Sequence, residues 1–87
     1  MYRVILVTAA SKKEARIIAK DLIKRKLAAC VNIIGAVESL FWWKGKVDSA
    51  KETLLVIKSI DKNVSKVIKA VKLIHSYEIP EVISLPI

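Results

Sequence analysis

Two segments of this chain are apolar at every position, which restricts the fold more than any other feature of the sequence. Residues 4–7 (VILV) and 54–57 (LLVI) are rich in β-branched side chains, so both are predicted to be strands. Successive side chains of a strand point to opposite faces of its sheet. Both faces of these strands are therefore apolar, and the folded protein must cover each of them.

Two other segments have the residue spacing of amphipathic helices. Ser11 and Glu14 form a capping box at the start of the first helix. The apolar stripe of this helix consists of Ala15, Ile18, Ala19, Leu22 and Ile23. Asp61 is expected to cap the second helix. Its apolar stripe consists of Val64, Val67, Ile68, Val71 and Ile74, and basic residues occupy the opposite face of both helices.

The segment between the helices is predicted to be a β-hairpin. Its first strand begins after Ala29, continues to residue 43 and is expected to bend or bulge near Gly35. Gly45 supplies the positive φ angle of a turn, and residues 53–57 return as the partner strand. Pro80 excludes helix at Ile79, so residues 82–85 are predicted to be the last strand.

These elements follow the order β-α-β-β-α-β within one domain that covers residues 1–87. With right-handed crossovers, this order predicts an α+β ferredoxin-like sandwich, in which four antiparallel strands carry both helices on one face. The chain has no further element to cover the other face. Another copy of the protein is expected to cover it, with Trp42 or Trp43 in the contact. The alternative is that both tryptophans curl around the hairpin tip and are partly exposed.

The composition is that of a folded protein in a reducing compartment. With 54% hydrophobic residues, the chain is too apolar to be disordered. A single cysteine, Cys30, favours the cytoplasm over a secreted disulfide framework. No apolar run approaches the roughly 18 to 20 residues that cross a bilayer, and the short apolar stretch near Met1 indicates a strand rather than a signal peptide. Abundant lysine and the absence of glutamine indicate a thermophilic source.

Four motifs carry a family resemblance. They are KLAACVN at 26–32, FWWKGK at 41–46, Glu52 together with Ile57 and Lys58, and HSYEIPE at 75–81. In this order they resemble the CutA divalent-cation tolerance family, from the first strand to the last residue. The resemblance implies a ferredoxin-like subunit that assembles as a compact homotrimer around a shared axis. It also implies a role in tolerance of divalent metal ions, copper first.

The sequence departs from the family pattern at three places. Family members usually continue past the Leu-Pro segment for a short strand and a helix, whereas this sequence ends at Ile87. The family histidine is usually followed by proline, and Ser76 in that position is expected to leave the loop less constrained. Some bacterial members are thought to bind copper through a first-strand cysteine and two adjacent histidines. Those positions hold Val7, Ile74 and His75 here.

His75 is the main candidate for a metal ligand, and Cys30 is the second. Copper or another divalent cation needs about three or four ligands, and only Glu78 or Glu81 would join them within one chain. Such a site is therefore expected to lie between subunits. The alternative interpretation makes His75 a structural helix-end histidine and Cys30 a small buried hydrophobic residue.

Four further residues match family positions for which the resemblance implies a cleft between subunits. These residues are Glu52, Lys58, Tyr77 and Glu81. The cleft would orient a small polar or anionic ligand. The alternative is that the four residues form salt bridges and hydrogen bonds between subunits. No nucleophile accompanies the single histidine in a motif, and no glycine-rich phosphate loop is present, so no enzymatic activity is expected.

The sequence thus predicts a homotrimeric divalent-ion tolerance protein that acts on the ion directly or through an unseen protein partner. The alternative is a trimeric signalling regulator that senses a small ligand, similar in architecture to nitrogen-regulatory trimers. A net charge of +8 supports a third hypothesis, a nucleic-acid-binding module. RNA-recognition modules stack bases on aromatic residues of the central strands, where this chain has only Tyr2. No specific nucleic acid and no membrane is therefore expected as a partner.

Overall fold

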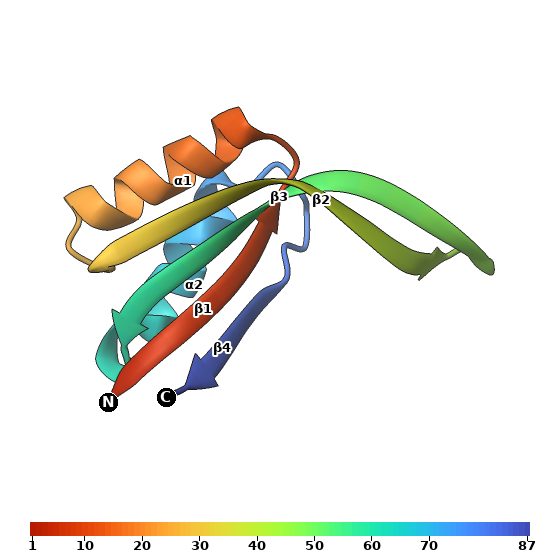
Figure 1. The fold of residues 1–87 in the computed structure, drawn as a ribbon. Helices are drawn as coiled ribbons and strands as arrows, with labels where there is room; N and C mark the ends of the chain where they lie inside the picture. Colours follow the sequence, from red (N-terminus) through yellow and green to blue (C-terminus); the bar gives the residue numbers. More distant parts are fainter.

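A computed structural model describes residues 1–87. The regular elements are β1 (Tyr2–Ala9), α1 (Lys12–Lys24), β2 (Cys30–Trp43), β3 (Lys46–Ile60), a short 3₁₀ turn (Asp61–Asn63), α2 (Val64–Ile74) and β4 (Val82–Pro86). The strands form one antiparallel sheet in the order β2-β3-β1-β4, and Figure 1 shows α1 and α2 together on one side of it. This arrangement confirms the α+β ferredoxin-like prediction. Neither helix has the length and apolar content needed to cross a membrane.

The core lies between the sheet and the two helices. On β1 and β3, every second residue points toward the helices, because side chains alternate along a strand. The eight largest fully buried side chains are Ile5, Val7, Leu55 and Ile57 from the sheet and Ile18, Leu22, Val67 and Val71 from the helices. These residues belong to the predicted stripes, but two stripe residues, Ile23 and Ile68, are not part of the core. Ile23 is 43% exposed, because it lies on the flank of α1 rather than against the sheet.

Helix α1 begins and ends with defined capping interactions. The Ser11 hydroxyl accepts a hydrogen bond from the Glu14 backbone N–H at 3.1 Å, as the capping box predicts. At the other end, Lys26 adopts a left-handed conformation with φ of 58°. The N–H groups of Lys26 and Leu27 donate to the carbonyl oxygens of Ile23 and Leu22. This pair of bonds is a Schellman motif, which glycine usually closes.

The prediction that Asp61 caps the second helix is wrong. Asn63 is the residue that precedes α2, and its side chain makes no capping hydrogen bond. The Asp61 carboxylate instead accepts a hydrogen bond from Arg3 Nε at 2.5 Å, which holds the pKa of Asp61 below its ordinary value. The residue type is suitable for a cap, but the start of β1 places the Arg3 side chain within reach of the Asp61 carboxylate.

Strands β2 and β3 are longer than the core requires and form a projecting arm (Figure 1). The returning strand was expected at residues 53–57 but spans Lys46–Ile60. A register shift between Ile34 and Val37 confirms the bulge near Gly35, and Ala36 at its centre has φ of 59°. Lys44 and Gly45 both have positive φ, which makes the arm tip a type I′ turn. We call residues 36–53 the arm.

The sheet face opposite the helices has no covering layer within the chain. Val4, Leu6, Leu54 and Val56 alternate with the core residues of β1 and β3 and are only half-buried on this face. The same face includes Ile83 and Leu85, which pair with Leu6 and Val4 and are 43% and 46% exposed. Trp42 and Trp43 on the arm are also exposed. The apolar face is defined as these six aliphatic residues of β1, β3 and β4.

Candidate functional site

His75 lies at the end of α2 and uses both of its ring nitrogens. Nε2 lies 2.6 Å from the carbonyl oxygen of Thr8, which only accepts, so Nε2 carries a proton. Nδ1 accepts a hydrogen bond from the backbone N–H of Tyr77 at 3.1 Å. These two partners assign the neutral tautomer with its proton on Nε2. Because the side chain is fully buried, a metal ion would reach the imidazole only after one of these bonds breaks.

Glu14 connects the start of α1 to the loop that follows α2. Its carboxylate accepts hydrogen bonds from the backbone N–H of Ala10 and from both the N–H and the hydroxyl of Ser76. Burial raises the pKa of Glu14, but the hydrogen bonds from Ser76 outweigh burial and leave this pKa below its ordinary value. The expectation that Ser76 loosens the loop is wrong. Serine donates two hydrogen bonds here, and proline has no backbone N–H to donate.

Glu52 and Tyr77 meet at the base of the arm. The Tyr77 hydroxyl donates a hydrogen bond to Glu52 Oε2 at 2.8 Å, and the Tyr77 ring lies 4.6 Å from the His75 ring, centroid to centroid. These contacts border a cavity of about 430 Å³, whose lining includes Thr8, Ser39 and Glu81. We call it the arm-base pocket. The structure therefore brings together three of the four residues predicted for a cleft.

The arm-base pocket is acidic although the protein is basic. Glu52 and Glu81 line it, and no lysine, arginine or histidine does. Burial raises the pKa of Glu52, but hydrogen bonds from the hydroxyls of Ser39, Tyr77 and Thr8 keep this pKa below its ordinary value. Burial and the bond to Glu52 raise the pKa of Tyr77 to about 12. At neutral pH the pocket therefore presents a charged carboxylate and a protonated phenol.

Lys58 and Cys30 lie together at the opposite end of the sheet. They are paired across β2 and β3, and both line a second cavity of about 570 Å³, together with Tyr2 and Ile87. Six residues of extended strand separate Lys58 from Glu52, which corresponds to about 20 Å. The alternative interpretation expected Cys30 to be a buried hydrophobic residue, but Cys30 is only half-buried. Within one chain, Cys30 therefore lies away from His75. Lys58 likewise lies away from the arm-base pocket.

The residues of one chain do not fit a metal site. No group of three or more histidine, cysteine, aspartate or glutamate side chains is arranged to hold an ion. His75 has both ring nitrogens in hydrogen bonds, and Cys30 lies beside Lys58 rather than beside another ligand. Copper and zinc sites need about three or four ligands. One subunit alone does not provide them.

The partners that fix His75 could not be predicted from the sequence. The capping box includes Glu14, but the contacts of Glu14 with Ser76 join positions that are 62 residues apart. A local sequence pattern does not predict contacts over such a separation. The role of Thr8 comes from its backbone carbonyl, which every residue type carries. The sequence marks Glu14 only as an acidic residue in the first turn of a helix. Its contact with the Ser76 loop follows from the packing of α1 beside α2.

A family profile and two similar curated proteins carry the same family name. A family profile described as "CutA1 divalent ion tolerance protein" matches residues 3–87. The divalent-cation tolerance protein CutA of Thermus thermophilus is 41% identical over 87 residues, which cover all of this chain and 84% of the relative. A chloroplastic relative from rice, Protein CutA 1, is 44% identical over 84 residues, which cover 97% of this chain. The chain spans only about half of that relative, 48% of its length.

Solved structures give the same result for the fold. The Thermus thermophilus divalent cation tolerance protein superposes with a TM-score of 0.97 over all of this chain and 84% of that one, at 41% identity. A structure from Archaeoglobus fulgidus, described as a periplasmic divalent cation tolerance protein, has a TM-score of 0.96 at 42% identity with the same coverage. These matches agree with the resemblance in the four sequence motifs.

Proposed function

Because this chain belongs to the CutA1 divalent ion tolerance family, we propose that it acts as a homotrimer in tolerance of or response to divalent metal ions. The names of its relatives support the role. The observation that supports assembly is the apolar face. Monomeric proteins rarely leave a contiguous apolar face of this kind in water, and copies of the same chain in a closed ring would remove it from solvent.

The assembly is tested by light scattering on the purified protein. The expected mass is three times the 9.7 kDa of one chain at micromolar concentration, because each copy buries its apolar face against a neighbour. A mass of one chain at that concentration would contradict the proposed trimer. A dimer would keep the burial but would exclude a shared three-fold axis.

Direct binding of copper or another divalent cation would require ligands from more than one copy, since one chain does not provide three. Calorimetric titration of the assembled protein with copper and then zinc measures this binding. His75→Ala and Cys30→Ser are the two informative variants, with unfolding measured in parallel. Loss of binding in a folded His75→Ala protein identifies the histidine as a ligand. Retained binding assigns the histidine to the hydrogen bonds described above, and no heat for any metal indicates that tolerance depends on a partner.

The protein is proposed to be cytoplasmic and without catalytic activity. The single cysteine supports a reducing compartment. The engagement of both His75 nitrogens supports the absence of catalysis, because the only imidazole is not free to move a proton. Fractionation of cells that express a tagged chain tests the location.

The arm-base pocket favours a second candidate function, the sensing of a small ligand by the assembled protein. Its charged carboxylate, phenol and apolar wall are the mixture found in small-molecule sites. The acidic lining suits an amine or another small cation, whereas an anion would require Lys58 from a neighbouring copy. Titration with small amines and small anions decides between them, with Glu52→Gln as the diagnostic variant. Binding of a small ligand without any binding of metal would favour this function over the first.

A further inference from the structure

The positive charge of this protein is confined to one layer of the fold. Eleven of the sixteen basic residues and three of the eight acidic residues lie in residues 11–26 and 61–74, so these two segments carry a formal net charge of +8. The five basic and five acidic residues elsewhere cancel. The two segments form α1, α2 and their immediate flanks, on the side of the sheet away from the apolar face. We call them the basic layer.

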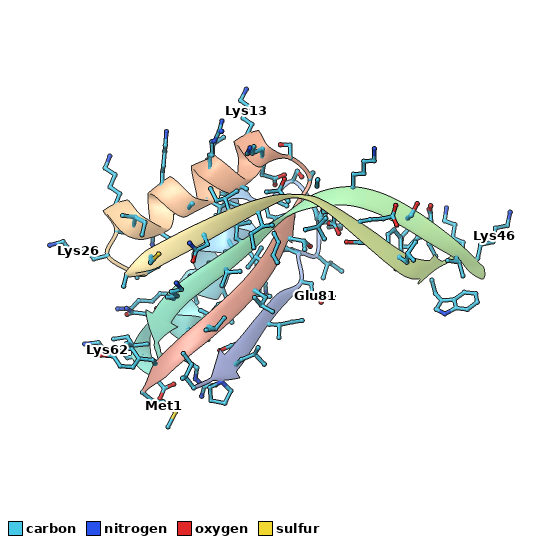
Figure 2. All side chains as sticks on the ribbon, in the orientation of Figure 1. Met1, Lys13, Lys26, Lys46, Lys62 and Glu81 are labelled. Carbon is cyan, nitrogen blue, oxygen red and sulfur yellow. The ribbon has the colours of Figure 1, made fainter.

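The cations of the basic layer are not neutralised by the acids within it. Glu14 bonds Ser76, Asp21 pairs with Arg25 at 3.2 Å, and Asp61 pairs with Arg3 outside the layer. The remaining ten basic side chains form no ion pair and are all exposed. They are Lys12, Lys13, Arg16, Lys20, Lys24, Lys26, Lys62, Lys66, Lys69 and Lys72. Figure 2 shows Lys13 and Lys26 extending away from the body.

These side chains form rows rather than scattered points. In α1, Arg16, Lys20 and Lys24 follow at intervals of four residues, so each is about 6 Å further along the helix axis. In α2, Lys66 and Lys69 are three residues apart and extend the array onto the neighbouring helix, since packed helices lie about 8 to 10 Å apart. An array of this density repels single cations and attracts a linear polyanion.

We propose that the basic layer is a docking surface for the phosphate backbone of a double-stranded nucleic acid, bound without sequence preference. A duplex carries one negative charge for about every 1.7 Å of its axis, which complements a dense array of lysines. Lysine outnumbers arginine in the layer, and lysine contacts phosphate as a point charge without reading base edges. The surface therefore binds charge and shape rather than sequence.

Two other polyanionic partners fit the layer less well. The layer has no aromatic residue, which single strands need for stacking and which usually anchors a protein at a lipid surface. Its exposed apolar side chains do not form an insertion stripe. Ile17 and Ile23, six residues apart, lie about 120° apart around α1, and Leu73 lies on α2. The proposal is independent of the trimer, because the apolar face lies on the other side of the sheet.

The test compares two variants that each lose three positive charges. Lys20→Gln with Lys24→Gln and Lys69→Gln neutralises the basic layer. Lys44→Gln with Lys46→Gln and Lys51→Gln is the matched control on the arm, where the lysines are equally exposed. Binding of a labelled duplex of roughly 20 base pairs is followed by fluorescence anisotropy between about 50 and 200 mM salt. Light scattering and circular dichroism verify that both variants keep the assembly and fold of the parent.

The proposal predicts that the layer variant binds at least tenfold more weakly and that its salt slope is smaller by about three, while the arm variant stays within about twofold of the parent. Equal weakening of both variants would overturn the proposal, because net charge alone would then explain binding. Absence of binding at about 50 mM salt would also overturn it. So would tighter binding to a single-stranded oligonucleotide or to vesicles with anionic lipid. If the layer variant is misfolded, Lys62→Gln with Lys66→Gln and Lys72→Gln replaces it under the same criteria.

Discussion

Glu14 shows how a single side chain can serve two parts of a small fold. Its backbone N–H takes part in the helix cap, and its carboxylate ties Ser76 to the start of α1. The Ser76 loop in turn positions Tyr77, whose N–H fixes the tautomer of His75. An unpaired carboxylate at this depth would be unfavourable, so the three hydrogen bonds are what make a charged Glu14 stabilising.

Glu14→Gln is expected to lower the free energy of unfolding by about 1 to 2 kcal/mol at pH 7, because hydrogen bonds to a charged acceptor are replaced by weaker ones. The pKa of Glu14 is depressed in the folded state, so its contribution is present above the ordinary value of 4.5 and is lost as pH falls through the folded pKa. Urea unfolding of parent and variant at pH 7 and near pH 3 measures the difference.

The difference in the free energy of unfolding between parent and Glu14→Gln should therefore be smaller in acid than at pH 7. Glu38→Gln is the matched control, since Glu38 is exposed on the arm and has no hydrogen bond or ion pair through its side chain. This control is expected to lie within about 0.5 kcal/mol of the parent at both pH values. If the difference in the free energy of unfolding between parent and Glu14→Gln is the same at pH 7 and pH 3, packing rather than the charge of Glu14 causes the loss of stability.

At the scale of single elements, the C-terminal end of α1 and the arm depend on backbone angles that their residue types do not favour. Lys26, Ala36 and Lys44 all have positive φ without being glycine. The Schellman bonds, the bulge and the type I′ turn hold these residues in place. Each position therefore stores some backbone strain that a glycine would relieve.

Lys26→Gly is expected to stabilise the protein by about 0.5 to 1 kcal/mol, because glycine adopts the left-handed conformation without steric cost. Lys24→Gly is the matched control, because it makes the same change within the last turn of α1 and should destabilise by about 1 kcal/mol. Thermal or urea unfolding at pH 7 measures both. A Lys26→Gly protein no more stable than the parent would indicate that the lysine side chain itself contributes at this position.

At the scale of the whole molecule, the sheet separates two surfaces of opposite character. The helices that carry the basic layer lie on one side of the sheet (Figure 1), and the residues of the apolar face point to the other side. Charge would oppose assembly through the helices, because like charges repel, whereas burial favours assembly through the sheet. Copies of this chain are thus expected to meet through their sheets and to present their helices to solvent.

Two exposed leucines test this orientation. Leu85 is 46% exposed on the apolar face, and Leu73 is 84% exposed on α2. Leu85→Glu is expected to shift the mass toward one chain in light scattering, because a charge would be buried between copies. Leu73→Glu is expected to keep the mass of the parent. The orientation would be contradicted if Leu73→Glu dissociated the assembly while Leu85→Glu left it intact.

Most of the fold could be predicted from the sequence because its signals are local. The capping box at Ser11, the bulge near Gly35 and the turn at Gly45 depend on neighbouring residues, and all three are present in the structure. The exceptions are equally informative. Asp61 has the right chemistry for a cap, but an arginine 58 positions away is a better partner for its charge. Ile23 follows the helical pattern, but it lies on the flank of α1 and is 43% exposed.

By itself, the amino-acid order determined the elements, their sequence along the chain and the family, because periodicity and turn chemistry act over a few residues. Only the tertiary structure decided which side chains meet. It placed Tyr77 against Glu52, separated Lys58 from both, and directed both nitrogens of His75 to backbone partners. Sheet order and register set these distances, and they arise from the packing of the whole core rather than from any single segment.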